Sequence, residues 1–335
     1  MKDKTALVVT SIARPNEILR ALARGCAENG YDFIVIGDEA SPPDFEIDGC
    51  DFYSLARQRA TDFKFARLCP TRHYARKNIG YLVAMRDGAS VIVETDDDNI
   101  AGAGFWAERG RIQRAAVTEE SSWVNVYRYF TSKNIWPRGF PLERVREDVP
   151  SYESLKVMGT DCPIQQSLVD ENPDVDAVYR LVLPLPQIFA KGLKVALGKG
   201  SWCPFNSQNT RWWREAFALL YLPSYCSFRM TDIWRSFVAQ RIAWVNGWGI
   251  LFDEATMRQE RNEHSLLRDF EDEIPGYLHN EQIREALATL ALKAGKEAIA
   301  ENLRVCYEKL VSMSLIGVEE LRLLDMWLED IERLS

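Results

Sequence analysis

Ser90-Val-Ile-Val-Glu-Thr-Asp-Asp-Asp-Asn99 is the segment that decides the fold, because its apolar run ends in three consecutive aspartates. The β-branched residues predict a buried strand, and a helix from about His73 to Asp87 leads into it through Gly88. Ligand sites in α/β sheets form where strands end. Residues 90–99 are therefore expected to be both a central strand and part of a site.

The chain upstream of this strand has the pattern of a β-α-β unit. Residues 5–12 predict a buried strand, Asn16 to Glu28 have helical spacing of apolar residues with Gly30 ending the helix, and residues 32–38 predict a second strand. Such a crossover favours parallel strands with a ligand crevice at their carboxyl ends. A Rossmann-like half is expected here.

Downstream of the acidic run the pattern is less regular. Short strands are expected near Trp123 to Tyr127, Ala177 to Leu183 and Val195 to Leu197. A helix is expected from Asp232 to Val245, and a last strand from Gly249 to Asp253. These segments predict a mixed sheet with long loops.

The last part of the chain changes character. From about Glu260 onward it is rich in Leu, Ala, Glu and Arg with helical periodicity, and it is interrupted at Pro275-Gly276, Ala294-Gly295 and Gly317. Three or four helices are expected. The predicted class is α/β, a mixed sheet flanked by helices with a C-terminal helical extension, divided into residues 1–258 and 259–335.

Composition narrows the possible functions. A net charge of -8 and a pI near 5.2 exclude a broad nucleic-acid-binding surface, since such surfaces depend on Lys and Arg. The first residues lack a signal-peptide pattern. The longest strongly apolar stretch, near Ala216 to Leu222, is far below the roughly 20 residues that span a bilayer. A cytoplasmic protein without a membrane span is expected.

The acidic triplet predicts a metal site. In a D-x-D arrangement Asp96 and Asp98 can converge on Mn²⁺ or Mg²⁺, which prefer hard carboxylate oxygens and bridge diphosphates. Asp96 and Asp97 are also expected to contact the bound nucleotide. The alternative is a solvated acidic turn, and the position at the end of a strand favours the metal site.

Two cations open the helix that precedes the strand. Arg76 and Lys77 lie where positive charge and free backbone N–H groups can face a diphosphate, although an ordinary solvated helix start is the alternative. The sequence has no Walker A motif and no G-x-G-x-x-G fingerprint. A nucleotide would therefore bind without those phosphate-binding loops.

Two further residues are candidates for chemistry. Asp232 begins a predicted helix after a loop, where its carboxylate can act as a general base on a substrate hydroxyl or serve as the helix N-cap. His264 follows the last predicted strand and can return to the site as a third metal ligand. A surface or core histidine is the alternative.

Several segments, in this order, resemble the STELLO family of glycosyltransferases. They are Lys77-Asn-Ile-Gly-Tyr, Asp96 to Asn99, Trp136-Pro-Arg-Gly-Phe-Pro-Leu, Pro173-Asp-Val-Asp-Ala-Val-Tyr-Arg-Leu, Phe205-Asn-Ser-Gln-Asn-Thr, Leu220-Tyr-Leu-Pro, Thr231-Asp-Ile-Trp-Arg-Ser-Phe and Arg261-Asn-Glu-His. The matching words cover most of the chain. His264 gains weight because it belongs to the last of them.

The resemblance implies a GT-A fold, with residues 1–258 binding the nucleotide sugar. It assigns Asp96 and Asp98 to the metal and diphosphate of a donor, expected to be a UDP-hexose, whose sugar passes to a hydroxyl of a glycan or other acceptor. If the reaction is inverting, Asp232 is the base. From the strand-end logic of this fold, the nucleoside pocket is expected to be lined by Thr10, Ser11, Arg14 and Asp38.

Two alternatives follow from the same resemblance. The family is distantly similar to the reversibly glycosylated polypeptides, which implies a nucleotide-sugar mutase, and a non-catalytic scaffold partner of a polysaccharide synthase is the other. The C-terminal face of Leu321, Leu324, Trp327 and Ile331 is expected to pack on the core or to form a homo-oligomer contact.

Overall fold

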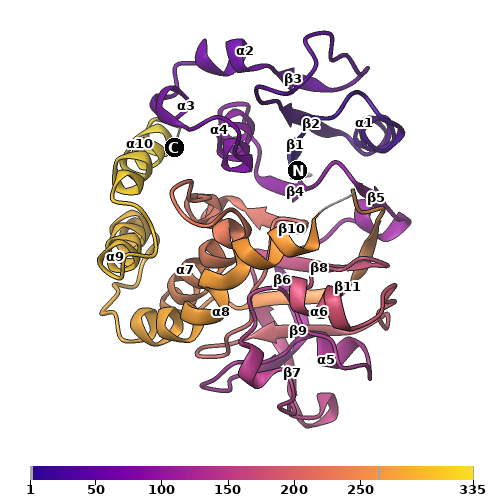
Figure 1. The fold of residues 1–335 in the computed structure, drawn as a ribbon, viewed down its shortest axis with the longest axis vertical. Coiled ribbons are helices and arrows are strands. Elements are labelled where there is room, and N and C mark those ends of the chain that lie inside the picture. Colours follow the sequence, from indigo (N-terminus) through magenta and orange to yellow (C-terminus); the bar gives the residue numbers. More distant parts are fainter. Residues whose placement is uncertain (1–2, 263–264, 335) are drawn as a thin grey trace.

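The computed structural model describes residues 3–262 and 265–334 and shows an α/β protein built on a mixed sheet (Figure 1). Within those ranges the sheet has eleven strands in the order β3-β2-β1-β4-β10-β8-β11-β9-β6-β7, and β5 pairs with β11. The strands are β1 (Thr5–Thr10), β2 (Tyr31–Ile36), β3 (Asp51–Tyr53), β4 (Val91–Thr95), β5 (Asn99–Ala101), β6 (Ile112–Thr118), β7 (Lys156–Asp161), β8 (Ile164–Asp170), β9 (Lys194–Leu197), β10 (Asn209–Trp213) and β11 (Ile250–Gln259).

Helices cover both faces of this sheet (Figure 1). They are α1 (Glu17–Asn29), α2 (Leu55–Arg59), α3 (Lys64–Leu68), α4 (Lys77–Arg86), α5 (Tyr127–Phe130), α6 (Ala177–Val182), α7 (Thr231–Val245), α8 (Leu266–Ala288), α9 (Ile299–Ser312) and α10 (Glu319–Leu334). The predicted class, a mixed sheet flanked by helices with C-terminal helices, is confirmed.

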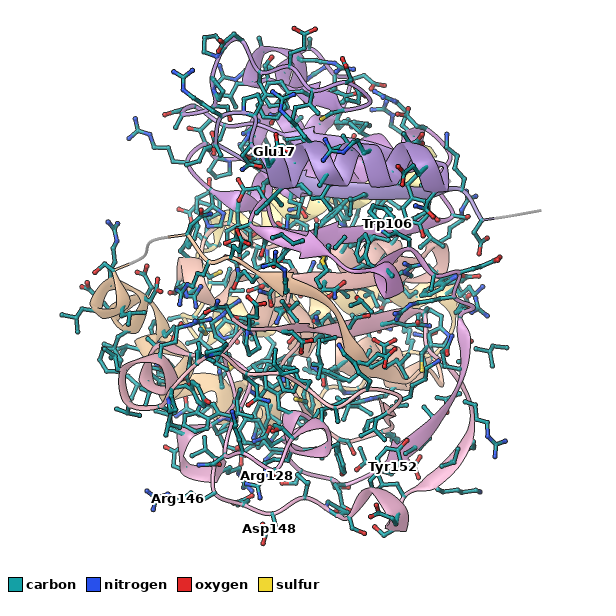
Figure 2. The ribbon with its side chains drawn as sticks, turned by 90° about the vertical axis from the view of Figure 1, so that its right-hand side faces the viewer. Glu17, Trp106, Arg128, Arg146, Asp148 and Tyr152 are labelled. Carbon is teal, nitrogen blue, oxygen red and sulfur yellow. The ribbon has the colours of Figure 1, made fainter. Side chains whose placement is uncertain are left out.

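The N-terminal β-α-β unit forms as predicted. Asn16 caps α1 by accepting from the Leu19 N–H, and Gly30 ends the helix at a positive φ of 72°. Alternate residues of β1 face opposite sides, so one side packs on α1 and the other on α4. α1 passes close to Trp106 (Figure 2), where a Cβ on Gly25 would lie 2.1 Å from the indole.

The strand directions bring several chain segments to one edge of the sheet. β1, β2, β3 and β4 are parallel, β10 is antiparallel to both β4 and β8, and β11 is parallel to β8. The carboxyl ends of β1, β2, β4, β8 and β11 therefore lie beside the amino end of β10. We call this the ligand edge.

Two predicted strands in the middle of the chain are wrong. Residues 177–182 form α6 because the Asp176 carboxylate caps the segment by accepting from the Tyr179 N–H, although its apolar residues also suit a strand. Trp123 makes an isolated bridge to Trp202, and Tyr127 begins α5. The strand near Val195 is confirmed as β9.

The C-terminal part differs from expectation at one break. α8 continues through Pro275, and Gly276 is buried there so closely that a Cβ would lie 2.3 Å from Met230 Sδ. Tertiary packing thus outweighs the loss of a helix hydrogen bond at proline. The breaks at Gly295 and Gly317 are confirmed. No described helix has the length and apolar character required of a membrane span.

The C-terminal helices share the main hydrophobic core with the sheet. Leu324 and Trp327 of α10 are fully buried in it, and Leu321 and Ile331 pack against it. These side chains therefore serve packing within the chain. Oligomerisation stays a prediction, as does the division at residue 258, which falls near the end of β11.

Candidate active site

A pocket of about 850 Å³ opens at the ligand edge. Eight residues predicted for the site line it: Thr10, Ser11, Asp38, Arg76, Asp96, Asp97, Asp98 and Asp232. Arg14 is exposed and does not line it, and Lys77 lies buried behind it. His264 lies outside the described residues.

The loops after β1 and β2 form one wall of the pocket. Ser11 Oγ donates to Asp97 Oδ2 over 2.5 Å, and the Ser11 N–H donates to the Ile36 carbonyl over 3.0 Å. Asp38 Oδ2 accepts from the His73 N–H over 3.0 Å. Hydrogen bonds thus connect the expected nucleoside wall to the acidic triplet.

Lys77 forms an ion pair with Asp96 from its buried position behind the pocket. Its side chain is fully buried, and Nζ donates to the Thr95 carbonyl at 3.0 Å and to Asp96 Oδ1 at 3.1 Å. Burial raises the pKa of Asp96 to about 6, and the Lys77 charge opposes that rise. Asp96 is thus an enclosed carboxylate that still faces the pocket, where its side chain is 40% exposed.

The Arg76 guanidinium is engaged elsewhere. Nε donates to Gln58 Oε1 over 2.8 Å and Nη1 to the Cys69 carbonyl over 2.9 Å. Gln58 in turn donates to the Gly37 carbonyl, so Arg76 supports the loop after β2. Its predicted diphosphate contact stays a prediction.

Asp98 is held by the end of β11. Its carboxylate accepts from Gln259 Nε2 at 3.1 Å and from the Asn262 N–H at 3.3 Å, and its carbonyl accepts from the Glu260 N–H. The strand predicted from the sequence ends at Asp253. Because β11 runs six residues further, to Gln259, these contacts were missed.

The donor chemistry of the triplet fits a hard divalent cation. Burial, with a contribution from each neighbouring Asp charge, raises the pKa of Asp96, Asp97 and Asp98, and a bound cation would favour their ionised forms. Each carboxylate nevertheless has its own partner, and within residues 3–262 and 265–334 no three acidic, His or Cys side chains are grouped closely enough to hold a metal. Asp96 and Asp98 would hold the ion together with nucleotide oxygens.

Asp232 faces the pocket from the first turn of α7. Arg138 donates to both carboxylate oxygens, at 3.0 and 3.1 Å, and Ser207 and Tyr74 also bond to it. Arg138 holds the pKa of Asp232 well below its usual range, against the effect of burial. The N-cap alternative is wrong, because α7 begins at Thr231 and Asp232 bonds to other elements.

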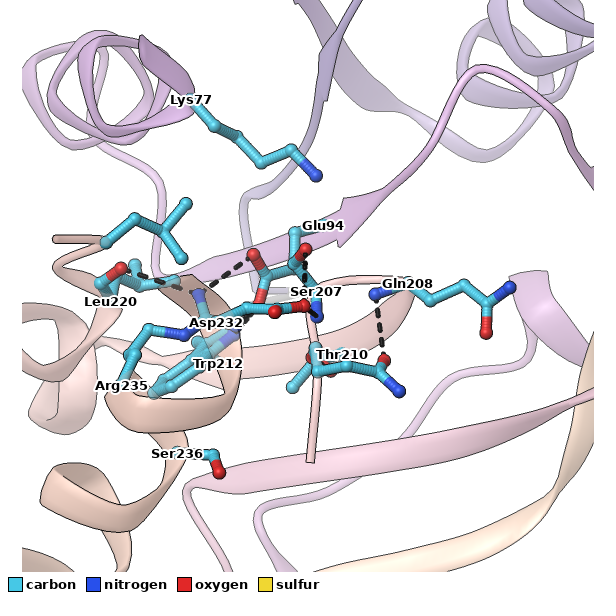
Figure 3. A network of polar contacts seen from close by, with 12 residues as sticks. Lys77, Glu94, Ser207, Gln208, Thr210, Trp212, Leu220, Asp232, Arg235 and Ser236 are labelled. Atoms are coloured by element: carbon cyan, nitrogen blue, oxygen red, sulfur yellow. Dashed lines mark hydrogen bonds and ion pairs between the residues drawn. The ribbon is translucent and has the colours of Figure 1, made fainter. Parts of the chain in front are cut away.

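A buried ion pair fixes α7 against β4 (Figure 3). Arg235 donates to both oxygens of Glu94, at 2.8 and 3.0 Å, and Trp212 Nε1 donates to the same carboxylate at 2.8 Å. Glu94 and Arg235 are almost fully buried. Since Glu94 precedes the triplet and Arg235 follows Asp232, this pair sets the position of Asp232 relative to Asp96.

Sequence reasoning missed the charged residues on the opposite wall. The pocket is also lined by Arg138, Asp174, Arg180, Arg229 and Arg261. Arg138 pairs with Asp174 at 2.8 Å. All of these except Arg229 lie within the quoted family words, so charged residues inside those words were the available signal.

Comparisons with known proteins point to one family. The model for STELLO glycosyltransferases matches residues 229–335. Two relatives from Arabidopsis thaliana, "Probable glycosyltransferase STELLO2" and "Probable glycosyltransferase STELLO1", are 28% and 27% identical over 97% of this chain. The chain spans 44% of the length of each.

Solved structures give a weaker likeness. Glucosyl-3-phosphoglycerate synthase from Mycobacterium tuberculosis with phosphoglyceric acid is 10% identical, with a TM-score of 0.43 over 84% of this chain and 80% of that chain. Its complex with Mn²⁺, UDP-glucose and phosphoglyceric acid is 12% identical, with a TM-score of 0.39 over 83% and 79%. Scores this low support no transfer of ligands to this chain. The sequence is similar to the STELLO glycosyltransferases along nearly its whole length, and the resemblance predicted from its ordered words is confirmed.

Proposed function

We propose that this chain is a metal-dependent glycosyltransferase that moves a hexose from a UDP-sugar to a hydroxyl acceptor. The observation that carries the proposal is the position of Asp96, Asp97 and Asp98 in the pocket, beside the ends of β1 and β2. The STELLO resemblance supports the reaction class.

In this proposal different parts of the pocket bind different parts of the donor. Ser11 and Asp38, which line the pocket, would bind the nucleoside, and Asp96 and Asp98 would bind the diphosphate together with Mn²⁺ or Mg²⁺. The ion would offset the negative charge that grows on the departing diphosphate. Lys77 adds positive charge behind Asp96 and fixes that carboxylate.

The transfer needs a proton acceptor. An acceptor hydroxyl oxygen bonds to the anomeric carbon while the bond from that carbon to the diphosphate oxygen breaks, and the electron pair leaves with UDP. In the inverting form, Asp232 takes the hydroxyl proton. Its low pKa makes it a weak base while Arg138 donates to both oxygens, so Arg138 must withdraw one donor during the transfer.

Incubation with a UDP-hexose and Mn²⁺, without any acceptor, tests the proposal. A transferase is expected to release UDP and free sugar slowly, because water replaces the acceptor, and Asp98→Ala should stop this release. An isomerised nucleotide sugar without UDP release would favour a mutase. If neither product forms and UDP does not bind, the scaffold alternative is favoured.

A further inference from the structure

Among the arginines near the ends of β8 and β11 in the described part of the chain, Arg180 lacks a charge partner. Arg229 bonds to Glu273 at 2.9 Å and Arg261 to Asp269 at 2.6 Å, both from α8. Arg180, by contrast, makes no ion pair within 4.0 Å in the described part of the chain. Its Nη2 donates to the Pro173 carbonyl, and its buried Nε has no hydrogen-bond partner there.

The surroundings of Arg180 favour the binding of an anion to its guanidinium. Burial and the positive charge of Arg261 lower the pKa of Arg180 to about 10, although the nearby charge of Asp174 opposes this shift. The group is still charged at neutral pH, so a guanidinium without a direct ion pair faces the pocket. A guanidinium of this kind suits a phosphate, which it can bind through two parallel hydrogen bonds.

Arg180 and Arg261 also face a second hollow. A groove of about 310 Å³ adjoins them and is otherwise lined by Asn262 and three leucines, Leu183, Leu185 and Leu266. We call these three residues the leucine groove. Because Arg180, Arg261 and Asn262 line both spaces, they stand between the main pocket and the leucine groove.

An exposed apolar surface continues from the leucine groove along α8. Leu267, Phe270, Ile274 and Leu278 follow Leu266 at helical spacing, and the side chains of Leu267 and Leu278 are 72% and 63% exposed. We call these four residues the α8 stripe. α6 packs on α8 and adds exposed Leu181 and Val182. Apolar patches of this kind on a protein surface mark binding sites.

We propose that this region binds a phosphorylated acceptor on a long apolar chain, a lipid phosphate that also carries the hydroxyl to which the sugar passes. Arg180 and Arg261 bind the phosphate, the leucine groove takes the first part of the chain, and the α8 stripe takes the rest. That this ligand is the acceptor rests on the proposed function. The site itself rests on the unpaired arginine beside an apolar groove.

The position of the arginines separates this site from the donor. Arg180 follows β8 and Arg261 follows β11, whereas the residues expected to bind the donor follow β1, β2 and β4. The amino end of β10 separates β4 from β8, although Asp98 itself accepts from the Asn262 N–H beside Arg261, so the phosphate would lie next to the metal rather than over the nucleoside. A donor and a phosphorylated acceptor can therefore bind together.

Calorimetric titration of the whole chain with decyl phosphate below its micelle concentration, without nucleotide, tests the site. Decyl phosphate is expected to bind, with butyl phosphate and decanol each at least about tenfold weaker, because one lacks the chain and the other the charge. Arg180→Gln and Leu266→Glu should each weaken decyl phosphate by a similar factor. Exposed Arg20→Gln on α1 and Ile112→Glu on β6 are matched controls and should leave it unchanged.

Three results would count against the proposal or part of it, and a fourth would separate it from a failure of the proposed donor function. Unchanged decyl phosphate affinity in well-folded Arg180→Gln and Leu266→Glu overturns it. An equal loss of UDP affinity with Mn²⁺ in Arg180→Gln assigns the arginine to the donor and also overturns it. A dimer that Leu267→Glu dissociates, with decyl phosphate affinity unchanged, assigns the α8 stripe to a second copy. Decyl phosphate binding without UDP binding supports the site while the proposed donor function fails.

Discussion

At the scale of the residue, the site depends on which carboxylates are neutralised and which are not. Asp232 has Arg138 on both oxygens, whereas Asp96 has a single contact from Lys77 and a raised pKa of about 6. Asp96 thus has spare coordinating capacity and, together with Asp98, is expected to bind the metal. The Asp232 carboxylate has no spare coordinating capacity and is held in place beside Asp96.

Asp232→Asn tests the role of that second carboxylate. We expect turnover to fall by about 100-fold or more, the usual effect of losing a general base, with UDP affinity preserved. Steady-state rates and UDP titration measure the two separately. Asp174→Asn is the matched control, because it also removes one carboxylate from Arg138. Unchanged turnover in Asp232→Asn, or an equal loss in Asp174→Asn, would remove the base assignment.

At the scale of the element, the pair Glu94–Arg235 connects β4 to α7 and so joins the acidic triplet to Asp232. Arg235→Met should lower the free energy of unfolding by about 3–5 kcal/mol, because it leaves Glu94 charged and buried. Urea denaturation measures the loss. The double variant with Glu94→Leu should recover part of it. A single variant as stable as the unaltered chain would contradict this reading of the pair.

Elements whose pattern is local were predicted from the sequence, and elements decided by distant contacts were not. Residues 16–30 contain both caps of α1, and the apolar run before Asp96 defines β4 without further information. α8 keeps its helix at Pro275 because Gly276 packs on Met230, a contact 46 residues away in sequence that no local pattern shows.

The candidate site divides in the same way. The triplet follows a strand and was visible as a motif, whereas Arg180 in α6 and Arg261 after β11 meet only when β8 and β11 pair. Because the predicted strand was shorter than β11, the hydrogen bond from Gln259 to Asp98 was not predicted either. Contacts between segments that are far apart in the sequence cannot be predicted from hydrophobic periodicity.

At the scale of the whole molecule, the C-terminal helices hold the pocket together. α8 supplies Asp269 and Glu273 to the arginine wall, and α10 buries Glu320, which accepts from Tyr221 and from the N–H groups of Ser224 and Tyr225. Asp330 of α10 also accepts from the first N–H groups of α3. The helical extension is thus part of the same folded body.

Glu320 makes the stability of this body depend on pH. Burial raises its pKa from 4.5 to about 7, so in that window the unfolded chain ionises Glu320 while the folded chain keeps the proton. The stability that this group contributes is present below about pH 4.5 and is lost as the pH rises through about 7.

The stability of Glu320→Gln relative to the unaltered chain should therefore rise as the pH increases from 5 to 8, by on the order of 1–3 kcal/mol. Denaturant titrations at the two pH values measure the change, with exposed Glu319→Gln as the control. A stability difference that does not change with pH would show that Glu320 ionises alike in both states.

The central claim is that the Asp triplet binds a nucleotide diphosphate through a divalent ion, and calorimetric titration with UDP, with and without Mn²⁺, tests it most directly. We predict binding that Mn²⁺ strengthens by about tenfold or more, and that Asp98→Ala removes this effect. Asp148→Ala, at a carboxylate that is 95% exposed, lies at the lower end of the molecule in Figure 2 and does not line the pocket, should behave as the unaltered chain. UDP that does not bind with Mn²⁺ or Mg²⁺, or binding that Asp98→Ala leaves intact, would contradict the account.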